Sequence, residues 1–441
     1  SATFTVRPYR STTSLRMIPF SPPRIDDITI KAVEDALRSG WITTGPRTKE
    51  FEIQLTKYLG AEKVIALNSW TNACELVLRW YGIGPGDEVI VPAYTYCATA
   101  NIVMHVGAKP VMVDVLDDFT MDPEAVRKAI TQRTKCIIPV DIGGLPARVE
   151  EIKRIAEEMC AYFTPAVNLR VAGSNPQMRL GRALVLCDAA HSFGARVDGK
   201  PVGTQADITG FSFHAVKNLT TSEGGALAFN LPEPFDVEEL YAYINVMSLH
   251  GQSKDALAKT KPGAWRYDVT QPGYKCNMTD IQAAIGLVEL ARYDSETMPR
   301  RKKICAQYDK AFSSDDRFII PAFTVERTPI KASTAIGSDH IITNESSYHL
   351  YMLRLASVTE AQRDAVIEAI SKRDVSVNVH FQPLPLLSFY KSKGYRIEDC
   401  PNAYKHYSCE ISLPVYYDLT TSQVDQVVTA VKAAVTEVLE R

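Results

Sequence analysis

Apolar residues recur at helical spacing near the start of the chain. One such pattern covers residues 25–39, and Gly40 follows it where a helix commonly ends. A second pattern covers residues 47–59 and is closed by Gly60. The sequence therefore predicts two consecutive amphipathic helices before the first strand-like segment.

After Gly60 the pattern changes to short, continuous apolar runs separated by helix-like or looping segments. These runs lie at residues 64–67, 88–92, 110–115, 136–140, 184–187 and 208–213. Strands that are apolar on both faces and alternate with helices are typical of a mainly parallel sheet. We therefore predict an α/β fold for this part of the chain.

The last third of the chain mixes the two patterns. Helices are predicted at residues 279–293, 300–312, 359–371 and 421–439, and strands at 348–355 and 375–381. Two segments, 161–182 and 325–347, show no clear periodicity and are predicted to be surface loops. This region reads as a smaller α+β unit.

A domain organisation follows from these patterns. We expect a large α/β domain over residues 17–296 and a small α+β domain over residues 297–441. Residues 1–16 lack periodicity and precede Met17, and we interpret them as a leader or an expression remnant.

Composition narrows the class of protein. A chain of 441 residues is long enough for two or three modules with sizeable cores. Its 49 basic and 51 acidic residues give a net charge of only -2, which does not favour nucleic acid or an anionic membrane as a partner. The nine cysteines are scattered without zinc spacing, so we expect buried, reduced thiols and no metal site. No stretch resembles a membrane span or a secretory signal, and a cytoplasmic protein is predicted.

One acid and one lysine stand at the ends of successive strand-like runs. Asp188 ends the run at 184–187, and Lys217 follows 29 positions later, in a polar loop after the run that contains Ser212. The interval leaves room for a turn and one strand, so both groups are expected at one sheet edge, where α/β proteins bind ligands. Upstream, Thr71 lies where a strand gives way to a helix, and free N–H groups at a helix N-terminus bind phosphate.

A lysine, an acid and a phosphate cradle are the groups that pyridoxal phosphate (PLP) requires. Lys217 would form a Schiff base with the cofactor and move protons between it and the substrate. Asp188 would keep the pyridine nitrogen protonated, and the hydroxyls of Thr71 and Ser212 would hold the phosphate. We therefore predict a PLP enzyme.

Five ordered stretches resemble one known family, the sugar aminotransferases of the DegT/DnrJ/EryC1/StrS group, which have the aspartate aminotransferase type of fold (fold type I). The stretches are Ser39-Gly-Trp-Ile-Thr-Thr-Gly-Pro46, Gly84-Pro-Gly-Asp-Glu-Val-Ile-Val-Pro-Ala-Tyr-Thr-Tyr96, Asp188-Ala-Ala-His-Ser192, Ser212-Phe-His-Ala-Val-Lys-Asn-Leu-Thr-Thr221 and Gly273-Tyr-Lys-Cys-Asn-Met-Thr-Asp-Ile-Gln-Ala-Ala284. They follow the family order over roughly residues 17–295, and the last third of the chain fits more loosely.

The resemblance implies a role for particular residues. It assigns the Schiff base to Lys217, the pyridine nitrogen to Asp188, ring stacking to Tyr96, and the phosphate to Thr71, Asn72 and Ser212. It also brings Asn277 to the phosphate from the neighbouring subunit, which implies a homodimer with shared active sites.

For each of two histidines the sequence leaves two interpretations open. His191 either contacts the cofactor ring or is a buried histidine with satisfied hydrogen bonds. His380 lies in a segment that resembles one approaching the sugar in relatives, and the alternative is an ordinary strand end.

Three features depart from the family pattern. Trp70 replaces the glycine that the phosphate loop usually has, and Asp141 stands where many relatives have a histidine. Residues 161–182 resemble an insertion.

The function implied by the resemblance is transfer of an amino group from glutamate to a nucleotide-linked keto sugar. The expected position is C-4 of a 4-keto-6-deoxyhexose, and the product would serve a surface polysaccharide or a glycosylated metabolite. An alternative is dehydration of the keto sugar at C-3, but related dehydratases have histidine where Lys217 stands, so the lysine favours transamination. A non-catalytic regulatory protein is a second alternative, although no basic DNA-binding segment is evident.

Overall fold

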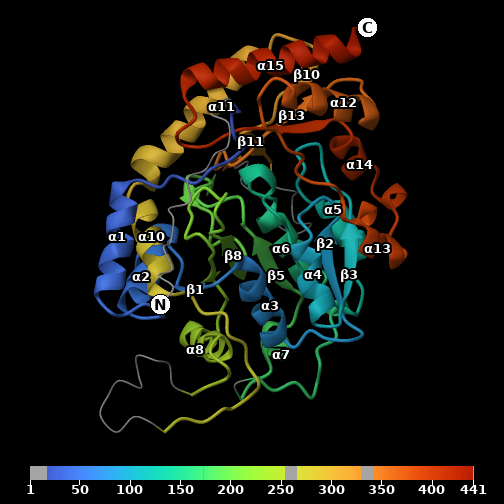
Figure 1. The fold of residues 1–441 in the computed structure, drawn as a ribbon. Helices are drawn as coiled ribbons and strands as arrows, with labels where there is room; N and C mark the ends of the chain where they lie inside the picture. The colour runs from blue at the N-terminus through green and yellow to red at the C-terminus, as the bar shows by residue number, and fades with distance from the viewer. Residues whose placement is uncertain (1–16, 172, 254–265, 329–340, 441) are drawn as a thin grey trace, which may run out of the picture.

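The computed structural model describes residues 17–171, 173–253, 266–328 and 341–440. A seven-stranded sheet lies at the centre, with strand order β1-β9-β8-β5-β4-β2-β3 (Figure 1). Its strands are β1 (Lys63–Leu67), β2 (Glu88–Pro92), β3 (Lys109–Val113), β4 (Thr134–Ile137), β5 (Leu184–Asp188), β8 (Ile208–Ser212) and β9 (Gly225–Phe229). All six predicted strands of this region are present, and the mainly parallel α/β class is confirmed.

The seventh strand, β9, was not predicted. It runs antiparallel to both of its neighbours, β1 and β8, whereas β8, β5, β4, β2 and β3 pair in parallel. Because β9 follows β8 directly in the chain, the two strands enclose the loop that carries Lys217.

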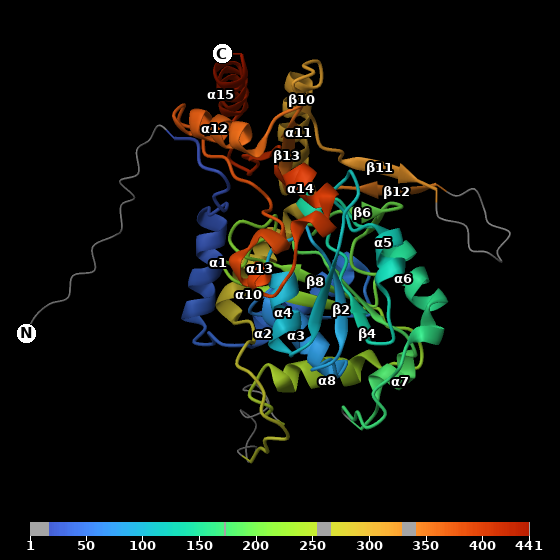
Figure 2. The same cartoon turned by 90° about the vertical axis from the view of Figure 1, so that its right-hand side faces the viewer.

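Helices cover both faces of this sheet (Figure 2). One face packs against α2 (Pro46–Leu59), α5 (Pro123–Ala129), α6 (Val149–Glu158) and α10 (Asp280–Ala291). The other packs against α3 (Trp70–Trp80), α4 (Ala98–His105) and α8 (Val237–Met247). Strands buried on both faces need apolar residues at every position, which accounts for the continuous apolar runs.

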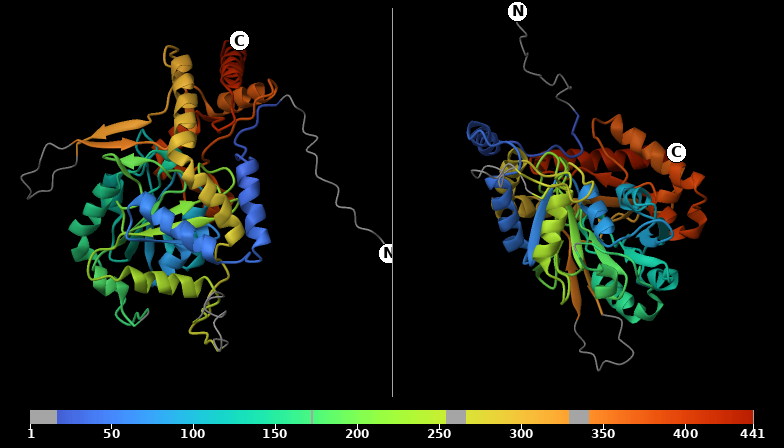
Figure 3. Two further views of the ribbon diagram at one scale, coloured as in Figure 1. Left: turned by 90° about the vertical axis from the view of Figure 1, so that its left-hand side faces the viewer. Right: turned by 90° about the horizontal axis from the view of Figure 1, so that it is seen from below.

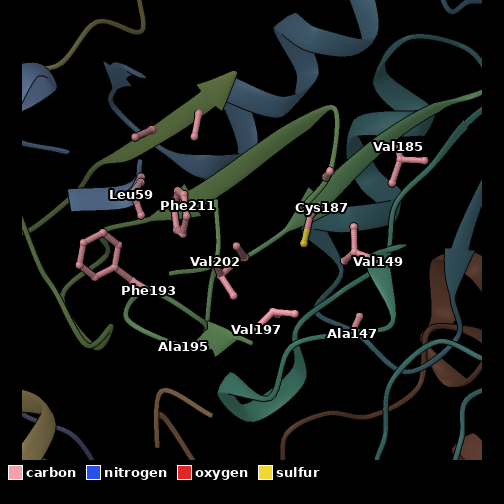
Figure 4. Close-up of a cluster of buried hydrophobic side chains, with 14 of the residues drawn as sticks. Leu59, Ala147, Val149, Val185, Cys187, Phe193, Ala195, Val197, Val202 and Phe211 are labelled. Atoms are coloured by element: carbon pink, nitrogen blue, oxygen red, sulfur yellow. The ribbon is translucent and has the colours of Figure 1, made fainter. Parts of the chain in front are cut away.

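Part of the core of the first face appears in Figure 4. Leu59 from α2 and Val149 from α6 lie in it with the strand residues Val185, Cys187 and Phe211. All five are buried, so close packing fixes β5 and β8, the two strands that end at the predicted site.

The two predicted N-terminal helices are present as α1 (Asp27–Arg38) and α2. Asp26 caps α1 by accepting a hydrogen bond from the Thr29 N–H, and Gly60 ends α2 in a left-handed conformation at φ 65°. Helix α1 packs against α10, far along the chain.

Most C-terminal elements gather at one end of the molecule, whereas α13 (Ser388–Ser392) lies beside the main sheet and packs into its core through Tyr390 (Figure 1). The others are η3 (Tyr293–Thr297), α11 (Met298–Phe312), β10 (Phe318–Ile319), β13 (Tyr351–Leu355), α12 (Glu360–Ser371), α14 (Pro401–Tyr407), β14 (Glu410–Leu413) and α15 (Thr421–Leu439). Strands β10, β13 and β14 form a small antiparallel sheet with its own apolar core, which Ile18 also joins.

The segment 325–347 was predicted to be a loop, and this prediction was wrong at both ends. Strands β11 (Thr324–Arg327) and β12 (Ile342–Glu345) pair antiparallel and project from the main body (Figure 3); residues 329–340 lie outside the described ranges. Strand β12 also pairs with β6 (Arg196–Val197), which pairs with β7 (Lys200–Pro201). The pairing joins segments distant in the chain, so local periodicity could not indicate it.

Two further segments differ from the prediction. Residues 375–381 make isolated backbone bridges, Val375 with Ile18 and Asn378 with Ser412, in place of the expected strand. Segment 161–182 contains a short helix, α7 (Pro176–Leu180), whose residue Gln177 is buried. In the part of the chain that the structure describes, no helix is long and apolar enough to cross a membrane.

Candidate active site

A cavity of about 340 Å³ lies beyond the carboxyl ends of β5 and β8. Seven of the nine residues predicted for the site line it, namely Thr71, Tyr96, Asp188, His191, Ser212, Lys217 and His380. They come from five separate stretches of the chain, so the fold brings together residues that are up to about three hundred positions apart. A position outside the carboxyl ends of parallel strands is where α/β folds bind ligands.

Asp188 is the buried acid of the cavity. Its Oδ2 accepts a hydrogen bond from Thr99 Oγ1 at 2.8 Å, and its Oδ1 accepts one from the Ala190 N–H at 3.2 Å. Burial raises the pKa of Asp188 to about 6, while the Thr99 and Ala190 hydrogen bonds and the charge of Lys217 act in the opposite direction. The carboxyl group is therefore largely ionised at neutral pH and remains available to a cationic partner.

Lys217 lies in the loop between β8 and β9, partly exposed to the cavity. Burial among protein groups lowers the pKa of its amine to about 8, and the nearby Asp188 carboxylate limits the decrease. A lowered pKa leaves a useful fraction of the amine neutral and nucleophilic near physiological pH.

The neighbour of the lysine fixes the loop. Asn218 is buried, and its Nδ2 donates to the Ser347 carbonyl at 2.8 Å and to Tyr293 Oη at 3.2 Å. The Lys217 N–H itself donates to the His214 carbonyl at 2.9 Å. These bonds set the direction from which the amine enters the cavity.

The N-terminus of α3 forms a second wall. Ser69 caps the helix by accepting a hydrogen bond from the Asn72 N–H, while the other first-turn N–H groups have no partner within the helix. A Cβ on Gly225 would lie 2.4 Å from the backbone of Ser69 and Trp70, so glycine is needed there for β9 to approach this helix end. Thr71 and Ser212 add hydroxyl groups to the same region of the cavity.

Trp70, which departs from the family pattern, is accommodated by a second glycine. Its side chain is buried, and a Cβ on Gly210 in β8 would lie 2.8 Å from its Nε1 and 2.4 Å from Cys74 Sγ. Trp70 also lines the cavity together with Ser69 and Thr71, so the start of α3 stays at the cavity despite the larger side chain.

Asp141, the other departure, is buried away from the cavity. Its Oδ1 accepts from the Ala147 N–H at 2.7 Å and its Oδ2 from Ser192 Oγ at 2.5 Å. Burial raises the pKa of Asp141 to about 7. Asp141 therefore joins the loop after β4 to the loop after β5.

His191 combines features of both interpretations. It lines the cavity, and its Nδ1 accepts a hydrogen bond from the Gly143 N–H at 3.2 Å. Burial and the positive charge of Lys217 hold its pKa well below the usual range, so the ring is neutral. With Nδ1 accepting, the proton resides on Nε2.

Aromatic rings surround the entrance. Tyr96 is 59% exposed, and its ring centroid lies 5.6 Å from that of Phe381, which in turn stacks against His191 at 5.6 Å. An exposed tyrosine at a cavity that also contains the lysine is available to cover a planar ligand.

Two predicted residues do not line the cavity of their own chain. Asn72 donates from Nδ2 to Asn68 Oδ1 at 2.8 Å. Asn277 donates from Nδ2 to Thr44 Oγ1 at 2.6 Å, near the start of α2. Their assigned contacts stay predictions.

Sequence reasoning missed Thr99 and His349, which both face the site. Thr99 holds Asp188, and His349 lies 4.5 Å from His191 between ring centroids while its Nδ1 is 2.8 Å from Asn218 Oδ1. The only available signal for Thr99 was its position three residues after Tyr96, at the start of a helix.

The arrangement fits PLP. A buried carboxylate, a lysine of lowered pKa and a helix N-terminus with hydroxyls converge on one cavity, and these are the donors that a protonated pyridine, an aldehyde and a phosphate require. When bound, PLP supplies a ring that accepts electrons from the bonds being broken at the substrate carbon.

Comparison with known proteins supports this assignment. The model of the DegT/DnrJ/EryC1/StrS aminotransferase family matches residues 23–164 and 181–432. The unmatched interval falls within 161–182, the segment that resembles an insertion.

Individual relatives extend over nearly the whole chain. The spore coat polysaccharide biosynthesis protein SpsC of Bacillus subtilis is 34% identical over 422 residues, 94% of this chain and 96% of its own. A structure of Spr1654 from Streptococcus pneumoniae, assigned as a sugar aminotransferase and solved in its PLP form, is 42% identical with a TM-score of 0.86, over 96% and 100% of the two chains. PseC of Helicobacter pylori, an aminotransferase involved in the biosynthesis of pseudoaminic acid, is 25% identical with a TM-score of 0.76, over 96% and 100%.

The chain belongs to the DegT/DnrJ/EryC1/StrS aminotransferase family. The predicted family, fold type I and dependence on PLP are therefore confirmed.

Proposed function

We propose that this protein transfers an amino group from glutamate to a nucleotide-linked keto sugar, at C-4 of a 4-keto-6-deoxyhexose. The observation that carries the proposal is the convergence of Lys217 and Asp188 in one cavity of a fold shared with aminotransferases. The sugar acceptor is supported by Spr1654, which is assigned as a sugar aminotransferase, and by SpsC, which serves polysaccharide biosynthesis. The product would enter a surface polysaccharide or a glycosylated metabolite.

Each residue has a defined task in this reaction. Asp188 holds a positive charge at the ring nitrogen, because it is buried and fixed by Thr99. Lys217 accepts and returns a proton at the substrate carbon, a task that suits an amine with a pKa of about 8. Thr71, Ser212 and the first turn of α3 bind the phosphate.

The aromatic and imidazole groups bind and orient the substrate. Tyr96 covers one side of the cofactor site and excludes water from it. His191 presents an Nε2–H to the cavity from a fixed ring. His380 lines the cavity beside these groups and is assigned to the sugar.

We infer a homodimer whose partner subunit contributes Asn277 to each phosphate site. Asn277 does not line the cavity of its own chain, in agreement with a role in a second copy. Ile28, Leu37 and Ile42, in and just after α1, are each at least 50% exposed, and Ile53 on α2 is 60% exposed. Several exposed apolar side chains on neighbouring elements are typical of a protein interface.

A cytoplasmic location is part of the proposal. Six of the nine cysteines are buried, and all nine are free thiols in the structure. Free thiols are typical of proteins in a reducing compartment.

The experiment that tests the proposal separates the two halves of the reaction. The PLP-loaded protein is mixed with glutamate alone, and formation of pyridoxamine phosphate is followed by absorbance. Nucleotide-linked 4-keto and 3-keto sugars are then added in turn, and the amino sugar is identified by mass spectrometry and NMR. Amination of a 4-keto sugar is the expected result, whereas loss of the C-3 hydroxyl without amination would support a dehydratase instead.

A further inference from the structure

The carboxyl group of Glu410 is buried next to His380 and does not line the cavity. Glu410 and Ser412 lie on β14, and both are fully buried. Glu410 Oε1 is 2.5 Å from Ser412 Oγ, which is 2.9 Å from His380 Nδ1. The three groups therefore form a continuous hydrogen-bonded path from the interior to a residue that lines the cavity.

His380 itself is held in one position. Its backbone N–H donates to Glu410 Oε2 at 3.0 Å, and its carbonyl accepts from Tyr94 Oη at 2.6 Å. Its ring stacks on Phe20 with centroids 5.4 Å apart and planes 22° apart. Because Nδ1 is engaged with Ser412, Nε2 is the ring nitrogen left for a ligand.

We propose that Glu410 is a positioning residue that acts through Ser412 to decide which nitrogen of His380 carries the ring proton. The inference rests on the proposed function and deepens it, since it states how the site presents either a hydrogen-bond donor or an acceptor to the keto sugar.

The two states follow from the hydrogen-bond rules. When Glu410 is ionised it can only accept, so Ser412 Oγ–H donates to it and His380 Nδ1–H donates to Ser412, which leaves Nε2 as an acceptor. When Glu410 is protonated on Oε1 it donates to Ser412, Ser412 donates to Nδ1, and the ring proton moves to Nε2. A keto or phosphate oxygen can bind only the second state, because these oxygens have no hydrogen to donate.

The surroundings allow both states near neutral pH. Burial raises the pKa of Glu410 to about 8, against the opposing effects of Ser412, the His380 N–H and the charges of Arg363 and Arg354. The Arg363 guanidinium donates to the Glu410 carbonyl rather than to its carboxyl group, and Arg354 contacts His406.

Apart from the arginines and Lys217, the titratable groups near this path stay uncharged near neutral pH. Tyr94 and Cys409 both have a pKa raised by burial. His406 has its pKa lowered to about 4, and His380 to about 3, by burial and by nearby positive charges, Lys217 in the case of His380. The His380 ring is therefore neutral in both states, and only the position of its proton changes.

Nitrogen NMR of the PLP-loaded enzyme, labelled with 15N in histidine, reads the position of the ring proton directly. The His380 signals are assigned by their loss in His380→Gln. The expected result is an Nε2–H form at pH 6 that converts to an Nδ1–H form by pH 9.5, with a midpoint near 8. Glu410→Gln should abolish the conversion, because its amide stays neutral at every pH.

Two further variants keep the test independent of folding. Ser412→Ala cuts the path and should also abolish the conversion, so it serves if Glu410→Gln does not fold. Glu52→Gln is the control: it replaces another buried carboxyl group, on α2, and the His380 ring proton should still move with pH. A wild-type ring proton that does not move, or one that still moves in Glu410→Gln, would overturn the proposal.

Kinetics then separate this proposal from the proposed function. The KM for the keto sugar should rise about tenfold between pH 7 and 9 in the wild type and stay nearly constant in Glu410→Gln, as expected for loss of one hydrogen bond to substrate. The half-reaction with glutamate should keep the same pH profile in both. If the ring proton moves but no keto sugar is aminated, the proposed function fails and the role of Glu410 is retained. If a keto sugar is aminated but the ring proton does not move, the proposed function is retained and the role of Glu410 fails.

Discussion

Asp188 and Lys217 enter the same cavity from the ends of the adjacent parallel strands β5 and β8, and each stabilises the charged form of the other. Burial acts against both charges, raising the pKa of the acid to about 6 and lowering that of the amine to about 8. These pKa values suit an ionised carboxylate at Asp188 that binds a cationic ring nitrogen, and a partly neutral amine at Lys217.

Thr99→Val should shift the acid limb of the pH profile. The hydrogen bond from Thr99 helps to hold the pKa of Asp188 down to about 6, so its loss should raise that pKa further. When the pH is lowered, activity that depends on ionised Asp188 should therefore begin to fall at a higher pH in the variant than in the wild type. PLP affinity at pH 7 should fall about tenfold. PLP titration and a kcat/KM profile measure this; Thr56→Val, a threonine of α2, is the control. An unchanged acid limb would show that Thr99 does not act on Asp188.

Lys217→Met should stabilise the protein that has been freed of PLP. Burial lowers the pKa of Lys217 from 10.5 to about 8, so between these values the unfolded state binds more protons and wild-type stability gains with rising pH. At pH 7 the charged amine opposes folding, and methionine should add about 1–2 kcal/mol to the free energy of unfolding.

Denaturant unfolding at pH 7 and pH 10 measures this effect. The difference between wild type and Lys217→Met should shrink toward the higher pH, since thiols and phenols are common to both proteins. Lys57→Met on the exposed face of α2 should leave the stability nearly unchanged. If Lys217→Met were less stable than the wild type at pH 7, the charged Lys217 amine would not oppose folding as proposed.

Gly210→Ala should destabilise the fold by about 1–3 kcal/mol, because a Cβ would overlap Trp70 and Cys74. Combining it with Trp70→Gly should recover part of this loss, which a double-mutant cycle on the free energy of unfolding would detect. Additive effects would mean that Gly210 does not make room for the indole.

Hybrid dimers test the proposed sharing of the active site between two subunits. Lys217→Ala and Asn277→Ala should each remove activity, but in the proposed dimer a mixed pair would have one site with an intact lysine and an intact asparagine from the partner. Random reassembly should therefore restore about one quarter of wild-type activity. If Asn277 served its own chain, mixing would restore none.

The sequence predicts most of the sheet and the meeting of Lys217 and Asp188 at one sheet edge, because both depend on local patterns. Continuous apolar runs mark strands buried on both faces, and Lys217 lies in a motif with a defined order. What could not be predicted rests on contacts between distant segments. Thr99 reaches Asp188 across 89 positions, and β12 pairs with β6 across more than a hundred. Glu410 belongs to no motif, and only the fold brings it to His380.

Peptide mapping after chemical reduction identifies the lysine that binds the cofactor. The PLP-loaded protein is treated with borohydride, which makes the link between cofactor and lysine permanent, and is then digested and analysed by mass spectrometry. We expect the cofactor mass on Lys217, and we expect Lys217→Ala to lose both the label and amino transfer. A label on another lysine, or amino transfer that persists in Lys217→Ala, would contradict the assignment of the Schiff base to Lys217.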